Sequence, residues 1–98
     1  VSGQIGLDPE KGKLVAGGIA EQAQQVFRNL AAILAAAGTG FERVVKTTVY
    51  LIDIADFRQV NEIYATFFPV PPPARSAIAV RELPLGAEIE IEVIAQIG

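Results

Sequence analysis

Apolar residues between positions 19 and 37 recur at spacings of three and four, which is the period of an amphipathic helix. Gly38 follows the last of them and suits a left-handed helix C-cap. β-Branched residues then crowd positions 41–52, which favours a strand. The chain therefore combines helix and strand within a short length. The helical stripe is Ala23, Val26, Phe27, Leu30, Ile33, Leu34 and Ala37.

A second helix is predicted after this strand, with Asp53 or Asp56 as its N-cap and Pro69 at its end. Further strands are predicted at residues 1–7, 13–15, 75–81 and 88–97, which gives the order β-β-α-β-α-β-β. We expect one α+β domain over residues 1–98, with two helices on one face of a mainly antiparallel or mixed sheet. One stripe of the second helix carries Phe57, Val60, Asn61, Tyr64, Phe67 and Phe68.

The last predicted strand alternates isoleucine and valine with Glu88, Glu90 and Glu92. If its apolar side faces the helices, the three carboxylates lie on the opposite face of the sheet. One interpretation is a solvated surface. The other is a subunit interface, because Ile94 lies on the same face and Tyr50 on a neighbouring one.

Arg75 follows a run of prolines at the start of a predicted strand. It is either a structural partner of one glutamate or an anchor for an anionic ligand. If residues 75–81 and 88–97 form a hairpin, Arg75 and Glu90 share a face about 13 Å apart. Ala77 and Ala79 would lie between them, which suggests the floor of a pocket with Arg75 at one end and Glu90 at the other.

Composition excludes several kinds of chemistry. With no Cys and no His, the chain has no disulfide, thiolate metal site or Ser-His-Asp triad. The net charge is −3 and no basic stripe occurs, so nucleic acid is a poor candidate partner. No apolar run is long enough to span a bilayer, and we expect a cytoplasmic protein. The 51% hydrophobic content favours homo-oligomerisation.

Two further signals are weak. Ser2-Gly3 is an ordinary strand end, a bulge, or a point where another group approaches the backbone closely. Lys46 is a lone charge in the central strand, and we expect it to be solvated or ion-paired.

Several motifs together resemble the RidA family, also called the YjgF/YER057c/UK114 family. The resemblance covers essentially the whole chain. Its most specific parts are the Pro-Ala-Arg-Ser-Ala-Ile-Ala-Val segment at 73–80, Leu83-Pro84, and Ile-Glu-Ile-Glu at 89–92. Val-Ser-Gly-Gln-Ile at 1–5 and Val-Val-Lys-Thr-Thr-Val-Tyr-Leu at 44–51 match further blocks, as does the second helix.

The resemblance implies a chorismate-mutase-like fold assembled as a homotrimer, in which the sheets form a central barrel and pockets lie between subunits. It implies cofactor-independent hydrolysis of 2-imino and 2-enamino acids, such as 2-aminoacrylate and 2-iminobutyrate, to 2-oxo acids and ammonia. A non-catalytic trimer that binds small 2-oxo or 2-imino carboxylates is the alternative. Some relatives have been described as ribonucleases, which the acidic composition disfavours.

Carried over by position, Arg75 would bind the substrate carboxylate and Glu90 would position or activate the attacking water. The backbone of Ala77 would contact the substrate, while Ser2 and Gly3 would line the pocket. Some relatives have Cys in place of Ala77. A role for that thiol is excluded in this chain, because alanine has none. Family members usually carry a strand and a pocket tyrosine before the Ser-Gly-Gln block, and we expect this chain to lack that strand.

Overall fold

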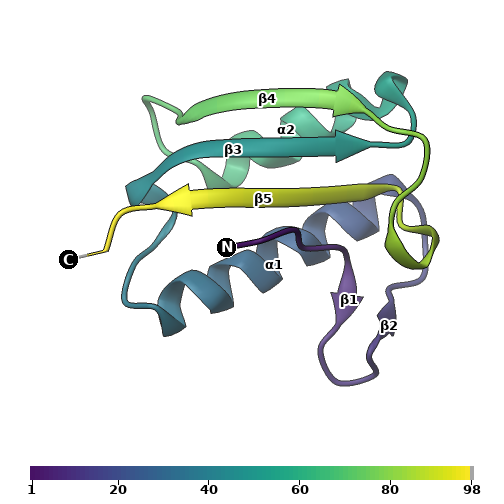
Figure 1. The fold of residues 1–98 in the computed structure, drawn as a ribbon, viewed down its shortest axis with the longest axis horizontal. Coiled ribbons are helices and arrows are strands. Elements are labelled where there is room, and N and C mark those ends of the chain that lie inside the picture. The colour runs from purple at the N-terminus through teal and green to yellow at the C-terminus, as the bar shows by residue number, and fades with distance from the viewer. Residues whose placement is uncertain (98) are drawn as a thin grey trace.

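The computed structural model describes residues 1–97, so Gly98, the last residue of the predicted domain, lies outside the described residues. A three-stranded sheet is covered on one face by two helices, α1 (Ile19–Ala36) and α2 (Phe57–Phe67) (Figure 1). The sheet contains β3 (Val44–Leu51), β4 (Ala74–Ala79) and β5 (Ile89–Ala95), and a small hairpin joins β1 (Leu7–Asp8) to β2 (Lys13–Leu14). The predicted α+β architecture and element order are confirmed.

Helix α1 forms where its sequence period predicts it. Its N-terminal turn is closed by Glu21, whose carboxylate accepts the backbone N–H of Gly18 at 3.1 Å. At the other end Gly38 has a φ of +81°, the left-handed conformation expected of a helix C-cap. The side chains of Phe27 and Leu30 are fully buried against the sheet, so α1 supplies much of the core.

Helix α2 begins after a short 3-10 turn at Ile54–Asp56. Asp53 caps that turn by accepting the backbone N–H of Ala55 at 2.9 Å, whereas the Asp56 side chain makes no capping hydrogen bond. The helix packs Val60 and Tyr64 into the core and ends before the proline-rich segment that leads to β4.

The order of the sheet is β4-β3-β5, with β4 parallel and β5 antiparallel to β3. The predicted hairpin between residues 75–81 and 88–97 is therefore wrong, because β3 separates the two strands. The segment β3-α2-β4 is a crossover unit, and a crossover through a helix returns the chain parallel to its first strand. Residues 80–88 then lead to the opposite edge of the sheet (Figure 1).

A β-bulge in β3 changes the face on which Val45 lies. The pairing of β3 with β5 shifts between Val44 and Lys46, so that Val44 and Thr47 are both buried and Val45 is 46% exposed. Val45 and Thr47 therefore lie on different faces, although they are two positions apart in β3.

The chain's first residues extend the sheet beyond β5. Gln4 and Ile91 exchange two backbone hydrogen bonds at 2.8 and 2.9 Å, and Val1 and Val93 exchange two more. This arrangement places Ser2 and Gly3 beside the strand that carries Glu90.

Candidate functional site

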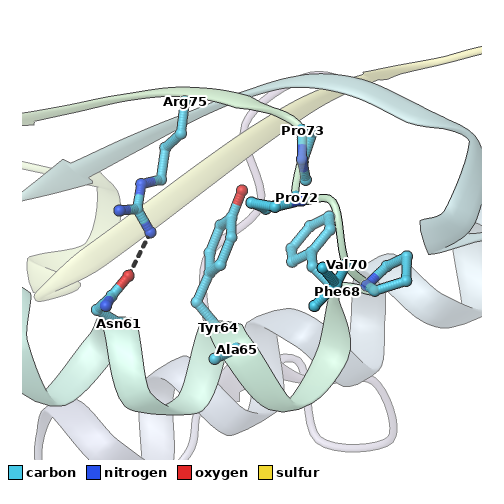
Figure 2. Close-up of a pocket in the computed structure, with 9 residues that line it drawn as sticks. Asn61, Tyr64, Ala65, Phe68, Val70, Pro72, Pro73 and Arg75 are labelled. Atoms are coloured by element: carbon cyan, nitrogen blue, oxygen red, sulfur yellow. Dashed lines mark hydrogen bonds between the residues drawn. The ribbon is translucent and has the colours of Figure 1, made fainter.

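Arg75 is the second residue of β4, separated by Ala74 from the prolines at 71–73. In the parallel register it pairs with Thr47, whose side chain is buried towards the helices. Residues paired across a sheet share a face, so Arg75 also points to the helix side. Figure 2 shows its guanidinium group reaching down to α2.

Three residues of α2 surround the Arg75 guanidinium group. Its Nη1 donates a hydrogen bond to Asn61 Oδ1 at 2.5 Å. The guanidinium carbon lies 4.9 Å from the ring centroid of Phe57 and 4.6 Å from that of Tyr64. Within residues 1–97 no glutamate or aspartate forms an ion pair with Arg75, so the interpretation of Arg75 as an intrachain partner of a glutamate is wrong.

Tyr64 lies beneath Arg75 and is held in a fixed position. Its ring is 4% exposed, and its hydroxyl shares a buried 2.9 Å hydrogen bond with Thr47. Burial raises the pKa of Tyr64, while the bond to Thr47 and the charge of Arg75 act in the opposite direction. The phenol therefore remains neutral and is held to the central strand.

A cavity of about 370 Å³ opens beside Arg75. Its walls come from the second half of α2 and from the proline-rich segment (Figure 2). Ala77, two residues beyond Arg75 on β4, shares its face and is half-buried. Because β4 is an edge strand, part of its backbone is unpaired in the single chain. The lining residues are Asn61, Tyr64, Ala65, Phe68, Pro69, Val70, Pro72, Pro73 and Arg75.

Glu90 belongs to a second group of side chains. It pairs with Tyr50 in the β3–β5 register and points away from the helices, as does Glu92. The hydroxyl of Tyr50 donates to Glu92 Oε1 at 2.9 Å, and this bond raises the pKa of Tyr50, with further contributions from burial and from the charges of both glutamates.

Gly3 lies directly against the Glu90 carboxylate. A Cβ atom added at Gly3 would lie 2.2 Å from Glu90 Oε2, so no larger residue fits without moving the carboxylate. The predicted close approach at Ser2-Gly3 is therefore present, and its partner is Glu90. Ser2 is exposed beside it.

The structure thus divides the predicted site residues into two groups. Arg75 and Ala77 lie on the helix side of edge strand β4, whereas Gly3 and Glu90 lie at the other edge. Thr47 pairs with Arg75 and Tyr50 with Glu90, and these two residues of β3 point to opposite faces. The predicted single pocket floor shared by Arg75 and Glu90 within one chain is therefore wrong.

The open face of the sheet carries more apolar surface than a solvated face needs. Ile52, Ile78 and Ile94 are 39%, 46% and 61% exposed on it, next to Tyr50 and the glutamates. Lys46 is exposed at the same face. Such a mixture of apolar and charged groups is typical of a surface that another chain covers.

Asn61, Tyr64 and Phe57 were not predicted as site residues. The available signal was their spacing of four and three, which places an asparagine between two aromatic residues on one helix face. No group of three or more acidic, histidine or cysteine side chains within residues 1–97 could hold a metal ion. No helix in this described part is long and apolar enough to cross a membrane.

Comparison with known proteins finds relatives along the whole chain. A family model described as Endoribonuclease L-PSP matches residues 1–97. A Rattus norvegicus protein named 2-iminobutanoate/2-iminopropanoate deaminase is 59% identical over 98 residues, which cover 100% of this chain and 72% of the rat protein. An Arabidopsis thaliana protein named Reactive Intermediate Deaminase A, chloroplastic, is 54% identical over 97% of this chain and 51% of its own length.

Solved structures give the same result for the fold. The crystal structure of RidA from the Antarctic bacterium Psychrobacter sp. has a TM-score of 0.95 and 45% sequence identity, and the match covers 99% of this chain and 78% of that one. The expected RidA-like fold is confirmed.

Proposed function

The chain belongs to the Endoribonuclease L-PSP family, and from this premise we propose that it hydrolyses small 2-imino and 2-enamino acids to 2-oxo acids and ammonia. Relatives at 55–59% identity are named 2-iminobutanoate/2-iminopropanoate deaminase. The observation that carries the proposal is Arg75, a cation without an intrachain carboxylate partner within residues 1–97, at the edge of a cavity. A carboxylate is the natural ligand of such a guanidinium fork.

In the proposed reaction Arg75 binds the substrate carboxylate and fixes the imine carbon relative to the attacking water. As the water oxygen bonds to the carbon of the protonated imine, the Glu90 carboxylate accepts one water proton and the C=N electron pair moves onto nitrogen. Glu90 then returns this proton to the nitrogen of the carbinolamine, the C–N bond breaks to release ammonia, and the hydroxyl group gives its proton to solvent as the C=O bond of the 2-oxo acid forms. The backbone of Ala77 contacts the substrate, and Ser2 and Gly3 border the carboxylate. An imine is already electrophilic, so the reaction needs no cofactor.

The position of Glu90 makes a second copy of the chain part of the proposal. Arg75 and Glu90 of one chain lie on opposite sheet faces, so one substrate meets both groups only if Glu90 comes from a neighbouring copy. The exposed isoleucines of the open face supply the apolar surface for this contact. We propose a homotrimer with its pockets between subunits, located in the cytoplasm.

A non-catalytic trimer that binds 2-oxo acids would use the same Arg75 pocket. The two functions differ only in turnover, so calorimetric binding of 2-oxobutyrate without hydrolysis would favour the binding protein. Ribonuclease activity is disfavoured by 8 basic against 11 acidic residues.

The direct test is ammonia release from 2-iminobutyrate generated freshly by a dehydratase. We expect the protein to accelerate this release, and the Arg75→Ala variant to lose the acceleration while remaining trimeric. Equal rates in both proteins would refute the assignment of Arg75.

A further inference from the structure

Arg75 is held by a neutral acceptor and by aromatic rings. Its guanidinium group donates to the amide oxygen of Asn61, and the rings of Phe57 and Tyr64 lie within 5 Å of the guanidinium carbon. No carboxylate among residues 1–97 takes part. The arginine is therefore oriented by contacts that leave its positive charge uncompensated.

The three contacts come from a single face of α2. Phe57, Asn61 and Tyr64 are separated by four and three residues, the spacing that brings side chains together on a helix. Tyr64 is in turn fixed to the central strand by its hydrogen bond to Thr47. The orientation of Arg75 is thereby linked to the hydrophobic core.

We propose that Asn61 is a positioning residue that orients Arg75 for the substrate carboxylate without neutralising it. This inference rests on the proposed function, since it assigns a role within the same carboxylate site. Asn61 accepts one N–H of the guanidinium group, and the remaining donors stay available for a ligand.

The choice of asparagine is the essential chemical feature. An aspartate at this position would have the same shape but would form a charge-assisted pair with Arg75. A substrate carboxylate would then have to displace that partner or bind to a neutralised arginine. Asparagine orients the guanidinium group through one hydrogen bond. The positive charge of Arg75 then remains available to attract the substrate carboxylate.

The test compares Asn61→Asp and Asn61→Ala with the wild type in 2-oxobutyrate binding by calorimetry and in imine hydrolysis. We expect Asn61→Asp to weaken binding by about tenfold to a hundredfold, because a charge-assisted bond competes with the ligand. Asn61→Ala loses the orienting bond but adds no charge, so its loss is smaller, about threefold to tenfold. Both variants should raise KM more than they lower kcat.

The order of the two variants distinguishes positioning from simple packing. If Asn61 only filled space, the isosteric aspartate would be tolerated better than alanine, and that order would overturn the inference. For Asn61→Asp, lowering the pH should also restore binding as the introduced carboxylate becomes protonated. Gln59→Glu is the matched control, since it adds the same charge at an exposed position on another side of α2.

The outcomes also separate this inference from the proposed function. If the wild type binds 2-oxobutyrate but does not hydrolyse imines, deamination is refuted while the binding comparison still decides the role of Asn61. If the wild type hydrolyses imines and Asn61→Asp binds like the wild type, only the inference is overturned. If the wild type neither binds nor hydrolyses, both are overturned.

Discussion

Arg75 and Glu90 belong to one three-stranded sheet but lie at opposite edges and on opposite faces of it. Their partners on β3, Thr47 and Tyr50, are three positions apart, and an odd separation along a strand reverses the face. The two groups proposed to act on one substrate are thus separated by the sheet in the single chain. Their cooperation requires two copies, which makes the arrangement testable.

Mixing two inactive variants should restore activity. When Arg75→Ala and Glu90→Gln chains are unfolded together in equal amounts and refolded, mixed trimers form in which one chain supplies Arg75 and its neighbour supplies Glu90. In a cyclic trimer about one quarter of all sites would then be intact. The measurement is the rate of imine hydrolysis, with each variant refolded alone as the control. A mixture as inactive as its components would contradict a shared site.

Substituting Gly3 with alanine should reduce activity through Glu90. The added Cβ would lie 2.2 Å from Glu90 Oε2, so the carboxylate must move. A displacement of about 1 Å in a catalytic group costs roughly a hundredfold in rate. Gly18→Ala is the matched control, because a Cβ at Gly18 meets nothing within 4 Å. We expect steady-state kinetics to show a loss of kcat for Gly3→Ala only, and equal losses would argue against the steric explanation.

Introducing a charge on the open sheet face should dissociate the oligomer. Ile94 is 61% exposed in the single chain, so Ile94→Glu leaves the monomer fold intact but places a carboxylate in the proposed interface. Light scattering should give the mass of one 10.4 kDa chain, and imine hydrolysis should be lost with the trimer. Ile54→Glu, at an isoleucine 54% exposed before α2, is the control and should stay trimeric. An unchanged mass for Ile94→Glu would place the interface elsewhere.

Removing the Tyr64 hydroxyl should reduce the sensitivity of the fold to alkali. Burial raises the pKa of Tyr64 above its ordinary value of 10.0, so the unfolded chain loses this proton at a lower pH than the folded protein. The folded state then binds more protons, and its stability falls as the pH rises above about 10. In Tyr64→Phe this contribution disappears, and urea unfolding at fixed protein concentration should show a shallower decline between about pH 9.5 and 11.

The same variant should be less stable at neutral pH. Tyr64→Phe leaves the Thr47 hydroxyl buried without its partner, which costs about 1–3 kcal/mol of unfolding free energy.

In the pH series, Tyr50→Phe is the comparison variant, because the pKa of Tyr50 is also raised, mainly by its hydrogen bond to Glu92. Parallel pH curves for Tyr64→Phe and the wild type would show that Tyr64 does not contribute to alkaline destabilisation.

Local sequence patterns were sufficient to predict the helices, the strands and part of the candidate site. The period of residues 19–37 predicted α1, and the alternation of residues 88–97 predicted which side of β5 is buried. These patterns are readable because side-chain direction within one helix or strand follows from its own geometry. Arg75 was recognised as a candidate site residue for a similar reason. Its position at the start of a strand that follows prolines is a local feature of the sequence.

Strand pairing was decided by the tertiary structure. Residues 75–81 and 88–97 are adjacent in sequence and suggested a hairpin, but the crossover through α2 placed β4 parallel to β3 and left β5 at the other edge. The bulge that exposes Val45 likewise depends on the partner strand. Which strands pair depends on residues that are far apart in the sequence, so the periodicity of a single segment does not reveal it.

By itself, the amino-acid sequence determined the helices, the strands and the buried side of β5, and it singled out Arg75 as a candidate anchor. Only the tertiary structure decided that Arg75 and Glu90 face opposite ways, that Gly3 abuts the carboxylate, and that Asn61 holds the arginine through a neutral hydrogen bond. The physical reason is that each of these contacts joins residues from different elements. Such contacts exist only after β3 has paired with both neighbours and α2 has packed beneath β4.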